Sequence, residues 1–403
     1  MRGKWLCARV WLWVLVGLLV VSCAGAADSK HGTGIRLAGQ VGLGREMRGV
    51  WIATVDNLDW PSRPCLAADV QRQEFRARLD EVRAMHLNTV VVQVRPMADA
   101  FYPSHYAPWS RFLTGMQGKN PGYDPLAFML AEAHKRGLAF HAWFNPYRVA
   151  NQDNVNVLVA NHPARSHPDW LVHYGGQLYY NPGIPAVREF VINSILEVVR
   201  RYAIDAVHLD DYFYPYPVAG QAFPDQETYQ RYGTRTFATK GDWRRDNINQ
   251  FVHELSQRIK QLKPRVEFGI SPFGVWRNKS AEASGSDTRA QVTDYDNLYA
   301  DIRHWIRQRW LDYVVPQIYW NIGFAPADYQ TLVRWWAHEV DGSPVQLYIG
   351  QAAYKVGTQP GPWSDPHQIQ QQLQMNRHYP LVRGSIFFSL KDLRRHPLVL
   401  ALT

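Results

Sequence analysis

The segment Val207-His208-Leu209-Asp210-Asp211 places a histidine and two carboxyl groups at the end of an apolar run. Side chains alternate along a strand, so His208 and Asp210 share one face, and the apolar residues between them share the other. A buried carboxylate is costly unless it is hydrogen-bonded or functional. We therefore interpret Asp210 as a functional group, and Asp211 as a second functional group or a loop-capping residue.

Cleavage of a glycosidic bond needs two carboxyl groups, because one protonates the leaving oxygen and the other attacks or activates water. Asp210 and Asp211 are one candidate pair. Glu227, in the segment after the same strand, is a second candidate partner, with an ordinary surface glutamate as the alternative. Asp287 and Asp392 are weaker candidates. Spacing along the chain does not fix distances in space, so it predicts neither retention nor inversion of configuration.

Aromatic, amide and arginine side chains follow several other apolar runs. Sugar rings stack on aromatic rings, while their hydroxyl and carboxylate groups take hydrogen bonds from amides and arginines. Together these residues predict a carbohydrate site, although a single Trp of this kind is more often an ordinary core residue than a sugar-binding one. The predicted substrate-binding residues are Arg95, Trp143, Asn145, Tyr147, Arg148, His208, Tyr212, Trp276, Arg277, Gln317, Tyr319 and Trp320, with Gln93, His141, Ser271 and Phe273 at matching positions.

A His-x-Asp pattern at a strand end is also compatible with a metal site, as in barrel amidohydrolases. Such a site needs three or more converging ligands, and His141 alone does not complete one. The sequence also has no phosphate-binding Gly-rich loop, no G-x-S-x-G motif and no reactive-cysteine motif. We therefore expect no metal and no cofactor.

Short β-branched or aromatic runs alternate eight times with longer segments of helical periodicity. One of these helices begins with Asp124-Pro125, a capping residue followed by a proline suited to the first turn. Eight such units predict an α/β protein with a single (β/α)8 TIM barrel. The predicted strands are 48–55, 88–95, 139–145, 206–211, 266–272, 313–319, 345–351 and 383–389.

The links between the predicted elements are unequal in length. Links from helix to strand are short, whereas links from strand to helix include 96–123, 146–186 and 212–242. In a barrel these long βα loops lie at the carboxyl end of the strands, where barrel enzymes build their active sites. We therefore expect a deep substrate groove there. Only residues 394–403 remain for a final helix, so the sequence leaves complete closure of the barrel open.

The composition is that of a globular protein, with 46% hydrophobic and 20% charged residues among 403, and it excludes a disordered or collagen-like chain. Three cysteines, Cys7, Cys23 and Cys65, exclude a disulfide framework. The formal net charge is +9. A basic exported protein favours acidic glycans, phospholipid headgroups or lipopolysaccharide as partners, and we expect no nucleic acid.

The first residues predict export. Arg2, Lys4 and Arg9 precede the apolar run 10–21, which is shorter than the roughly 20 residues of a membrane span. The run ends in Val20-Val21-Ser22-Cys23, which resembles a bacterial lipobox. We expect a signal peptide over 1–22, lipidation of Cys23, a flexible tether over 23–46, the barrel over 47–393 and a short tail over 394–403. Ordinary signal cleavage within 24–27 is the alternative.

Long stretches of the chain carry a family likeness. They read MRGVWIATVDNLDWPS from Met47, NPGYDPLAFMLAEAHKRG from Asn120, HAWFNPYRV from His141, HLDDYFYP from His208, EFGISPFGVWRN from Glu267, GSDT from Gly285, DYVVPQIYW from Asp312 and LYIGQAAYKVG from Leu347. With these motifs the chain resembles the bacterial glycosyl-hydrolase-like 10 family, which includes divisome-localised glycosyl hydrolase lipoproteins of the cell envelope.

The resemblance implies a barrel hydrolase of peptidoglycan glycan strands that amidases have stripped of stem peptides. These strands carry a free lactyl carboxylate on every second sugar, which Arg95, Arg148 or Arg277 would pair with. The resemblance also implies a catalytic neighbourhood of Asp210, Asp211 and Glu227, with the acid and the base unassigned. It further implies a lipid anchor at the periplasmic face of the outer membrane, through Cys23, and cell-division partners. The alternatives are a glycan-binding protein without turnover and a metal-dependent polysaccharide deacetylase.

Overall fold

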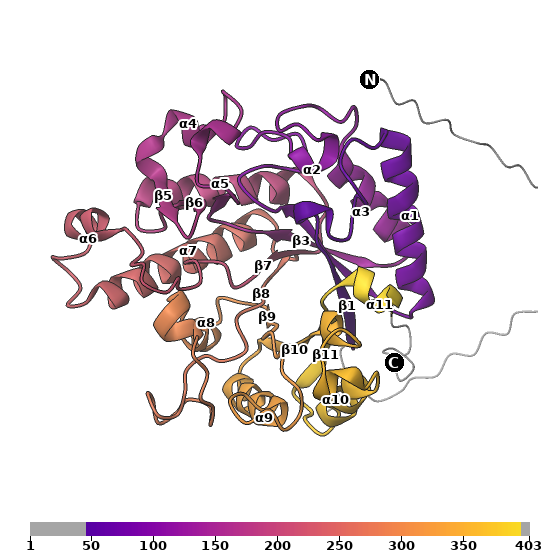
Figure 1. The fold of residues 1–403 in the computed structure, drawn as a ribbon, viewed down its shortest axis with the longest axis vertical. Helices are drawn as coiled ribbons and strands as arrows, with labels where there is room; N and C mark the ends of the chain where they lie inside the picture. Colours follow the sequence, from indigo (N-terminus) through magenta and orange to yellow (C-terminus); the bar gives the residue numbers. More distant parts are fainter. Residues whose placement is uncertain (1–45, 396–403) are drawn as a thin grey trace, which may run out of the picture. The chain divides into compact units, whose positions relative to one another are not determined.

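The computed structural model describes residues 46–395, so the predicted signal peptide, Cys23 and nearly all of the predicted tether lie outside the described residues. Eight parallel strands close into a barrel in the order β1-β11-β10-β9-β8-β7-β3-β2 (Figure 1). They are β1 (Met47–Ile52), β2 (Thr89–Arg95), β3 (Ala139–Phe144), β7 (Ala206–Leu209), β8 (Glu267–Ile270), β9 (Tyr313–Val314), β10 (Gln346–Gln351) and β11 (Val382–Phe387). The predicted (β/α)8 fold is confirmed, and the pairing of β1 with β11 completes the closure that the sequence left open.

Helices surround the barrel. They are α1 (Ala68–Ala84), α2 (Arg111–Thr114), α3 (Pro125–Lys135), α4 (Pro163–Ser166), α5 (Pro185–Arg201), α6 (Gln226–Tyr232), α7 (Lys240–Leu262), α8 (Ile302–Arg307), α9 (Tyr329–Val340), α10 (Gln368–Asn376) and α11 (Leu390–Arg395). The predicted start of α3 is confirmed, because the Asp124 carboxylate accepts a hydrogen bond from the Ala127 amide at 3.0 Å and proline occupies the first turn.

Strand β9 is shorter than the predicted strand 313–319. Pro316 interrupts it, because proline has no amide hydrogen for the ladder. Bridges resume at Gln317, which pairs with Phe273 on one side and with Gly350 on the other. The chain therefore keeps its place in the barrel wall beyond the proline, and Gln317 reaches the carboxyl end of the strands.

The long link between β3 and α5 contains a small antiparallel sheet of order β4-β6-β5, which the sequence reading treated as loop. Its strands are β4 (Arg148–Ala150), β5 (Leu171–Tyr174) and β6 (Gln177–Tyr180). In Figure 1 strands β5 and β6 lie beside α4 and α5, away from α1 and α11. This insertion begins only four residues after β3 ends, so Arg148 is held close to the carboxyl end of the barrel.

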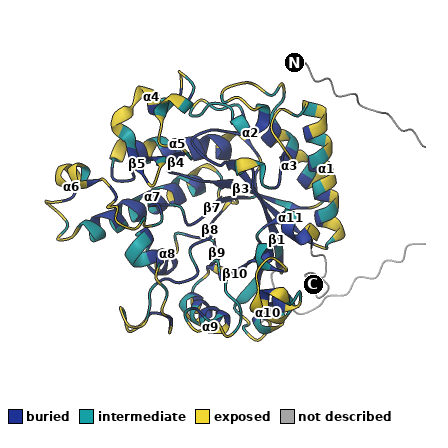
Figure 2. Ribbon diagram, in the orientation of Figure 1, coloured by how far each residue is buried: buried dark blue, intermediate teal, exposed yellow. Residues whose placement is uncertain are grey.

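Within residues 46–395, two hydrophobic clusters make up the core. The larger one lies between the strands and the helices, and it includes Val207 and Leu209 of β7. The smaller one fills the barrel, with Trp51, Trp143, Ala206, Tyr313 and Tyr348 among its members. Figure 2 shows the result, with buried strands at the centre and exposed residues on the outer faces of the helices.

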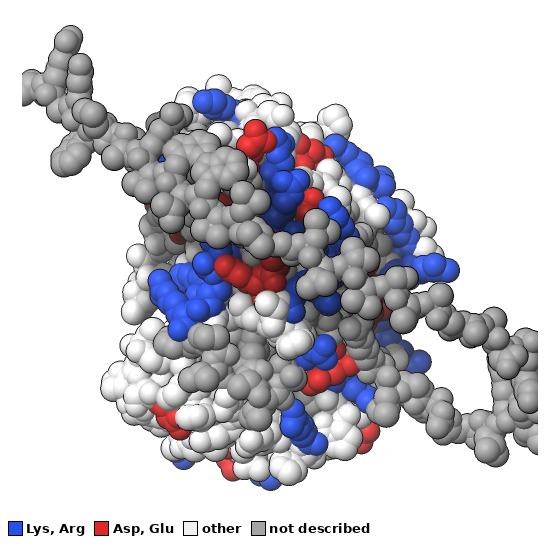
Figure 3. Space-filling view, turned by 90° about the vertical axis from the view of Figure 1, so that its right-hand side faces the viewer, with Lys and Arg blue, Asp and Glu red and all other residues white. Residues whose placement is uncertain are grey.

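The described surface is mixed in charge. Figure 3 shows Lys and Arg side chains spread over one face, with Asp and Glu side chains between them. On α1, Arg72 pairs with Asp69 and Arg78 pairs with Glu81. Within residues 46–395, no helix combines the length and the apolar composition needed to cross a membrane.

Candidate active site

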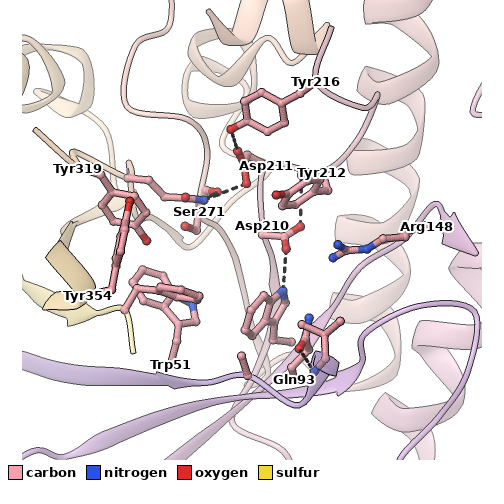
Figure 4. A pocket seen from close by; sticks show the side chains of 15 residues that line it. Trp51, Gln93, Arg148, Asp210, Asp211, Tyr212, Tyr216, Ser271, Tyr319 and Tyr354 are labelled. Atoms are coloured by element: carbon pink, nitrogen blue, oxygen red, sulfur yellow. Dashed lines mark hydrogen bonds between the residues drawn. The ribbon is translucent and has the colours of Figure 1, made fainter. Parts of the chain in front are cut away.

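A cavity of about 250 Å³ opens at the carboxyl end of the barrel strands (Figure 4). Aromatic rings form much of its wall, and its acidic groups are Asp210 and Asp211, the two residues that follow β7. The lining residues are Trp51, Ala53, Val55, Gln93, Trp143, Arg148, Asp210, Asp211, Tyr212, Tyr216, Ser271, Gln317, Tyr319, Tyr354 and Phe388. The end of the barrel that the unequal loop lengths indicated is therefore the end that carries this cavity.

Asp210 is buried and points toward β3. Its Oδ2 accepts hydrogen bonds from the Trp143 indole at 3.1 Å and from the Asn145 amide, and its Oδ1 accepts one from the Tyr212 backbone amide at 3.2 Å. Burial, followed by the charge of Asp211, raises the pKa of Asp210 to about 7. Near neutral pH this carboxyl group is therefore able to give up or take a proton.

Asp211 is also buried, and its carboxylate points away from that of Asp210 (Figure 4). It accepts a hydrogen bond from the Tyr216 hydroxyl and another from Gln317 Nε2 at 3.0 Å. Burial raises the pKa of Asp211, while these two donors lower it. Two like charges so close together disfavour double ionisation, so the two aspartates titrate as a pair.

An amide pair supports Asp210 from the β2 and β3 side. Gln93 Nε2 donates to Asn145 Oδ1 at 2.6 Å, and Gln93 Oε1 accepts from the backbone amides of Thr54 and Val55, both at 3.0 Å. Because the carbonyl oxygen of Asn145 faces Gln93, its NH2 group faces Asp210. Gln93 thus fixes the orientation of the amide that donates to the carboxylate.

Arg148, at the start of β4, contributes a positive charge to the cavity. Its guanidinium carbon lies 4.7 Å from the centre of the Tyr212 ring, and its side chain points toward Asp210 in Figure 4. The positive charge lowers the pKa of both aspartates. Arg148 therefore favours the ionised forms that burial disfavours.

His208 faces the barrel axis, as the alternation along β7 predicts. Its Nε2 accepts a hydrogen bond from the Trp51 indole at 3.2 Å, and its Nδ1 lies 3.0 Å from the Tyr313 hydroxyl. The same hydroxyl lies 2.8 Å from His141 Nδ1. Burial lowers the pKa of His141 to about 4 and that of His208 well below its usual value, so both rings are neutral. Trp51 lines the cavity, whereas His208 does not. His208 therefore supports the site indirectly, because its hydrogen bond holds the Trp51 indole in place.

The structure brings eight further predicted residues to this site and leaves others outside it. Besides Asp210, Asp211 and His208, the residues at the site are Trp143, Asn145, Arg148, Tyr212, Gln317 and Tyr319, with Gln93 and Ser271 from the matching positions. Glu227 is exposed on α6 and does not line the cavity. In Figure 1 α6 lies at the far left, well away from the end of β7.

Arg95 is fully buried beside the barrel wall. The register of β2 against β3 shifts between Gln93 and Arg95, so Arg95 is paired with Phe144 rather than with the residue after it. This bulge turns Arg95 away from the axis. Its guanidinium donates to the backbone oxygen of Asn145 at 2.8 Å and does not line the cavity.

The other predicted residues occupy different surroundings. Tyr147 is buried against Phe251 of α7, because adjacent residues of an extended segment point in opposite directions and Arg148 takes the direction of the cavity. Trp276 and Arg277 line a separate cavity of about 360 Å³. Trp320 packs its ring edge-to-face with Phe273, with 5.4 Å between the ring centres.

Several residues at the site were not predicted. Trp51, Tyr216, Tyr354 and Phe388 line the cavity from chain positions far apart, and nothing in their local sequence marks their direction. Asp294 is buried close enough to Asp211 for that charge, after burial itself, to raise the pKa of Asp294 well above its usual value. The run Asp294-Tyr295-Asp296 in the loop after β8 was the available signal for it.

Among residues 46–395, no three or more His, Cys, Asp or Glu side chains converge in a group that could hold a metal ion. His141 and His208, inside the barrel, direct their Nδ1 atoms at the Tyr313 hydroxyl.

Comparison with known proteins identifies the class. A family model described as "Glycosyl hydrolase-like 10" matches residues 46–365, so the chain belongs to this family. It is 58% identical over 356 residues to Glycosyl hydrolase YngK of Bacillus subtilis (strain 168), covering 88% of this chain and 70% of that protein. It is 44% identical over 364 residues to Glycosyl hydrolase DigH of Escherichia coli (strain K12), covering 85% and 82%. The predicted family is confirmed, and a glycoside hydrolase role is supported.

Solved structures confirm the architecture. The PgaB (BpsB) glycoside hydrolase domain from Bordetella bronchiseptica aligns with a TM-score of 0.57 and 12% identity over 89% of this chain and 98% of that one. The endo-1,4-beta-mannanase from Rhizomucor miehei aligns with a TM-score of 0.54 and 10% identity over 86% of both chains. At these identities the likeness is one of fold alone.

Proposed function

We propose that this protein is a glycoside hydrolase that cleaves the glycan strands of peptidoglycan, acting on strands already stripped of their stem peptides. The observation that carries the proposal is the pair Asp210 and Asp211, two buried carboxyl groups in one aromatic-walled cavity, one with a pKa of about 7. A proton-holding carboxyl group beside a second carboxyl group is what glycosidic cleavage requires. The family and its named relatives point to the same reaction class.

The two aspartates take different roles. Asp210 holds a proton near neutral pH and donates it to the oxygen of the leaving sugar. Asp211, whose ionised form receives hydrogen bonds from Tyr216 and Gln317, is the partner that attacks the anomeric carbon or removes a proton from the attacking water. The configuration of the product, measured by NMR during the first turnovers, distinguishes these two actions of Asp211.

The walls of the cavity suit an amino-sugar strand. Trp51, Tyr319, Tyr354 and Phe388 offer ring faces for the C–H faces of sugars. Arg148 offers a positive charge where an anionic sugar would lie. A strand with alternating neutral and carboxylate-bearing sugars meets both features.

The test is mass spectrometry of products after the protein acts on intact and on peptide-stripped peptidoglycan. We expect shortened glycans from the stripped strands, and we expect Asp210→Asn to lower their formation at least about a thousandfold, since the general acid is lost. Asp69→Asn, an exposed aspartate of α1, is the matched control with full activity. Binding of strands without any product from the wild type would instead favour a glycan-binding protein.

We also propose that the protein works in the cell envelope as a lipoprotein, anchored through Cys23 and associated with cell division. The lipobox-like segment before Cys23 supports the anchor. Metabolic labelling with a radioactive fatty acid tests it: label on the wild type and none on Cys23→Ser is expected, whereas unlabelled wild type would mean ordinary signal cleavage.

A further inference from the structure

Arg148 is a cation that acts on Asp210 and Asp211 across the cavity without a direct ion pair to either. Within the described residues, Arg148 forms no ion pair, and its buried Nε has no hydrogen-bond partner. Its guanidinium lies over the face of Tyr212, with 4.7 Å between the guanidinium carbon and the ring centre. The contact with Tyr212 orients the guanidinium. Because Arg148 is only partly buried and lines the cavity, the guanidinium is open to a ligand.

The other two arginines predicted to bind an anionic sugar already have partners within the protein. Arg95 is fully buried, and its guanidinium donates to the backbone oxygens of Asn145 and Pro146. Arg277 forms a two-pronged ion pair with Asp296, at 3.0 and 2.9 Å. Of these three candidates, Arg148 is therefore the one whose guanidinium forms no hydrogen bond or ion pair among the described residues, and it lies in the same cavity as the aspartate pair.

We propose that Arg148 is a specificity residue that binds a free carboxylate on the substrate sugar, and that this contact selects peptide-stripped strands. The inference rests on the proposed function. In peptidoglycan the stem peptide is joined to the lactyl group through an amide, so an intact strand has no negative charge at that position. Removal of the peptide exposes the carboxylate, and a planar guanidinium binds a carboxylate with two parallel hydrogen bonds.

The contact has a second effect on the aspartate pair. In the free protein the charge of Arg148 favours ionisation of both Asp210 and Asp211. A substrate carboxylate on Arg148 offsets that charge and raises the proton affinity of the pair. The general acid is then protonated most fully when the correct sugar is bound.

The test compares two substrates that differ in one group. Peptide-stripped strands carry the free lactyl carboxylate, and the same strands treated with methylamine and a carbodiimide carry a neutral methylamide. We expect wild-type kcat/KM to be about ten- to a hundredfold higher on the carboxylate strands, the range for a hydrogen-bonded ionic contact. Arg148→Gln should lose this preference, so that its kcat/KM is nearly equal on the two kinds of strand. Arg231→Gln, in which the arginine covers Tyr232 on exposed α6, should keep the preference.

Other results would overturn the inference. If Arg148→Gln loses activity equally on both substrates, Arg148 acts on the ionisation of the aspartates and does not bind the substrate carboxylate. If the wild type cleaves both kinds of strand equally, the enzyme does not distinguish the free carboxylate from the amide. If the wild type cleaves neither, the proposed function fails, and calorimetric binding of the two oligosaccharides to wild type and Arg148→Gln then decides the carboxylate contact by itself. Circular dichroism confirms that each variant is folded.

Discussion

Removing the Asn145 amide tests the assignment of Asp210 as the acid. Asn145 donates a hydrogen bond to Asp210 Oδ2, and this donor stabilises the ionised carboxylate. A hydrogen bond to a charged group contributes about 1.5–3 kcal/mol. At 1.36 kcal/mol per pKa unit, Asn145→Ala should raise the pKa of Asp210 by about one to two units. The Trp143 and Tyr212 donors remain, so we expect the lower end of this range.

The assay is the pH dependence of kcat/KM on peptide-stripped strands. If Asp210 is the general acid, the alkaline limb belongs to it and moves to higher pH in Asn145→Ala, while the acidic limb stays. Gln317→Met removes a donor from Asp211 and should move the acidic limb instead. Asn193→Ala is the matched control, since this amide donates to Glu189 on the outer side of α5.

Movement of the acidic limb in Asn145→Ala would reverse the two roles. An alkaline limb that is unchanged, or that moves to lower pH, would refute the argument that the Asn145 donor holds down the pKa. The side-chain carboxyl carbon of Asp210, followed by NMR, reports the same shift without turnover.

Two further predictions concern stability. Tyr313→Phe leaves the Nδ1 atoms of His141 and His208 without a partner, and we expect a loss of about 2–4 kcal/mol in urea unfolding; a loss below about 1 kcal/mol would contradict the role of the hydroxyl. Burial raises the pKa of Asp99 from 3.8 to about 6, so its cost to folding is absent below pH 4 and complete above pH 6. Asp99→Asn should therefore be more stable than wild type by up to about 3 kcal/mol at pH 8, and the advantage should vanish near pH 4; an advantage equal at both pH values would mean that charge is not the cause.

The sequence predicted the barrel because its strands are short, apolar and regularly separated by helices. The direction of Asp210 was also predictable, because strict alternation along β7 turns the polar residues toward the axis. The same alternation fails for Arg95, because a bulge after Gln93 shifts the register of β2 against β3. No residue type in the sequence predicts this bulge. Tyr147 and Arg148 are adjacent residues of which one faces the cavity, and the β4-β6-β5 sheet decides which.

The remaining site residues could not be predicted from the sequence, because only closure of the barrel brings them together. Trp51 and Tyr354 are separated by most of the chain, and they meet because β1 and β10 both border β11. Their types fit either a core or a sugar-binding wall. Glu227 was selected for its position after β7, but the length of that loop carries it out to exposed α6.

The hydrogen bonds along the barrel axis have one direction. The Trp51 indole can only donate, so His208 Nε2 accepts and its Nδ1 carries the hydrogen. That hydrogen goes to the Tyr313 oxygen, which leaves the Tyr313 hydroxyl hydrogen for His141 Nδ1. Trp51 lines the cavity, while His141 lines another at the opposite end of the strands. In this series of hydrogen bonds, each donated N–H or O–H bond therefore points away from the catalytic carboxyl groups. The negative ends of these aligned dipoles face the cavity, where a positive charge develops on the sugar during cleavage.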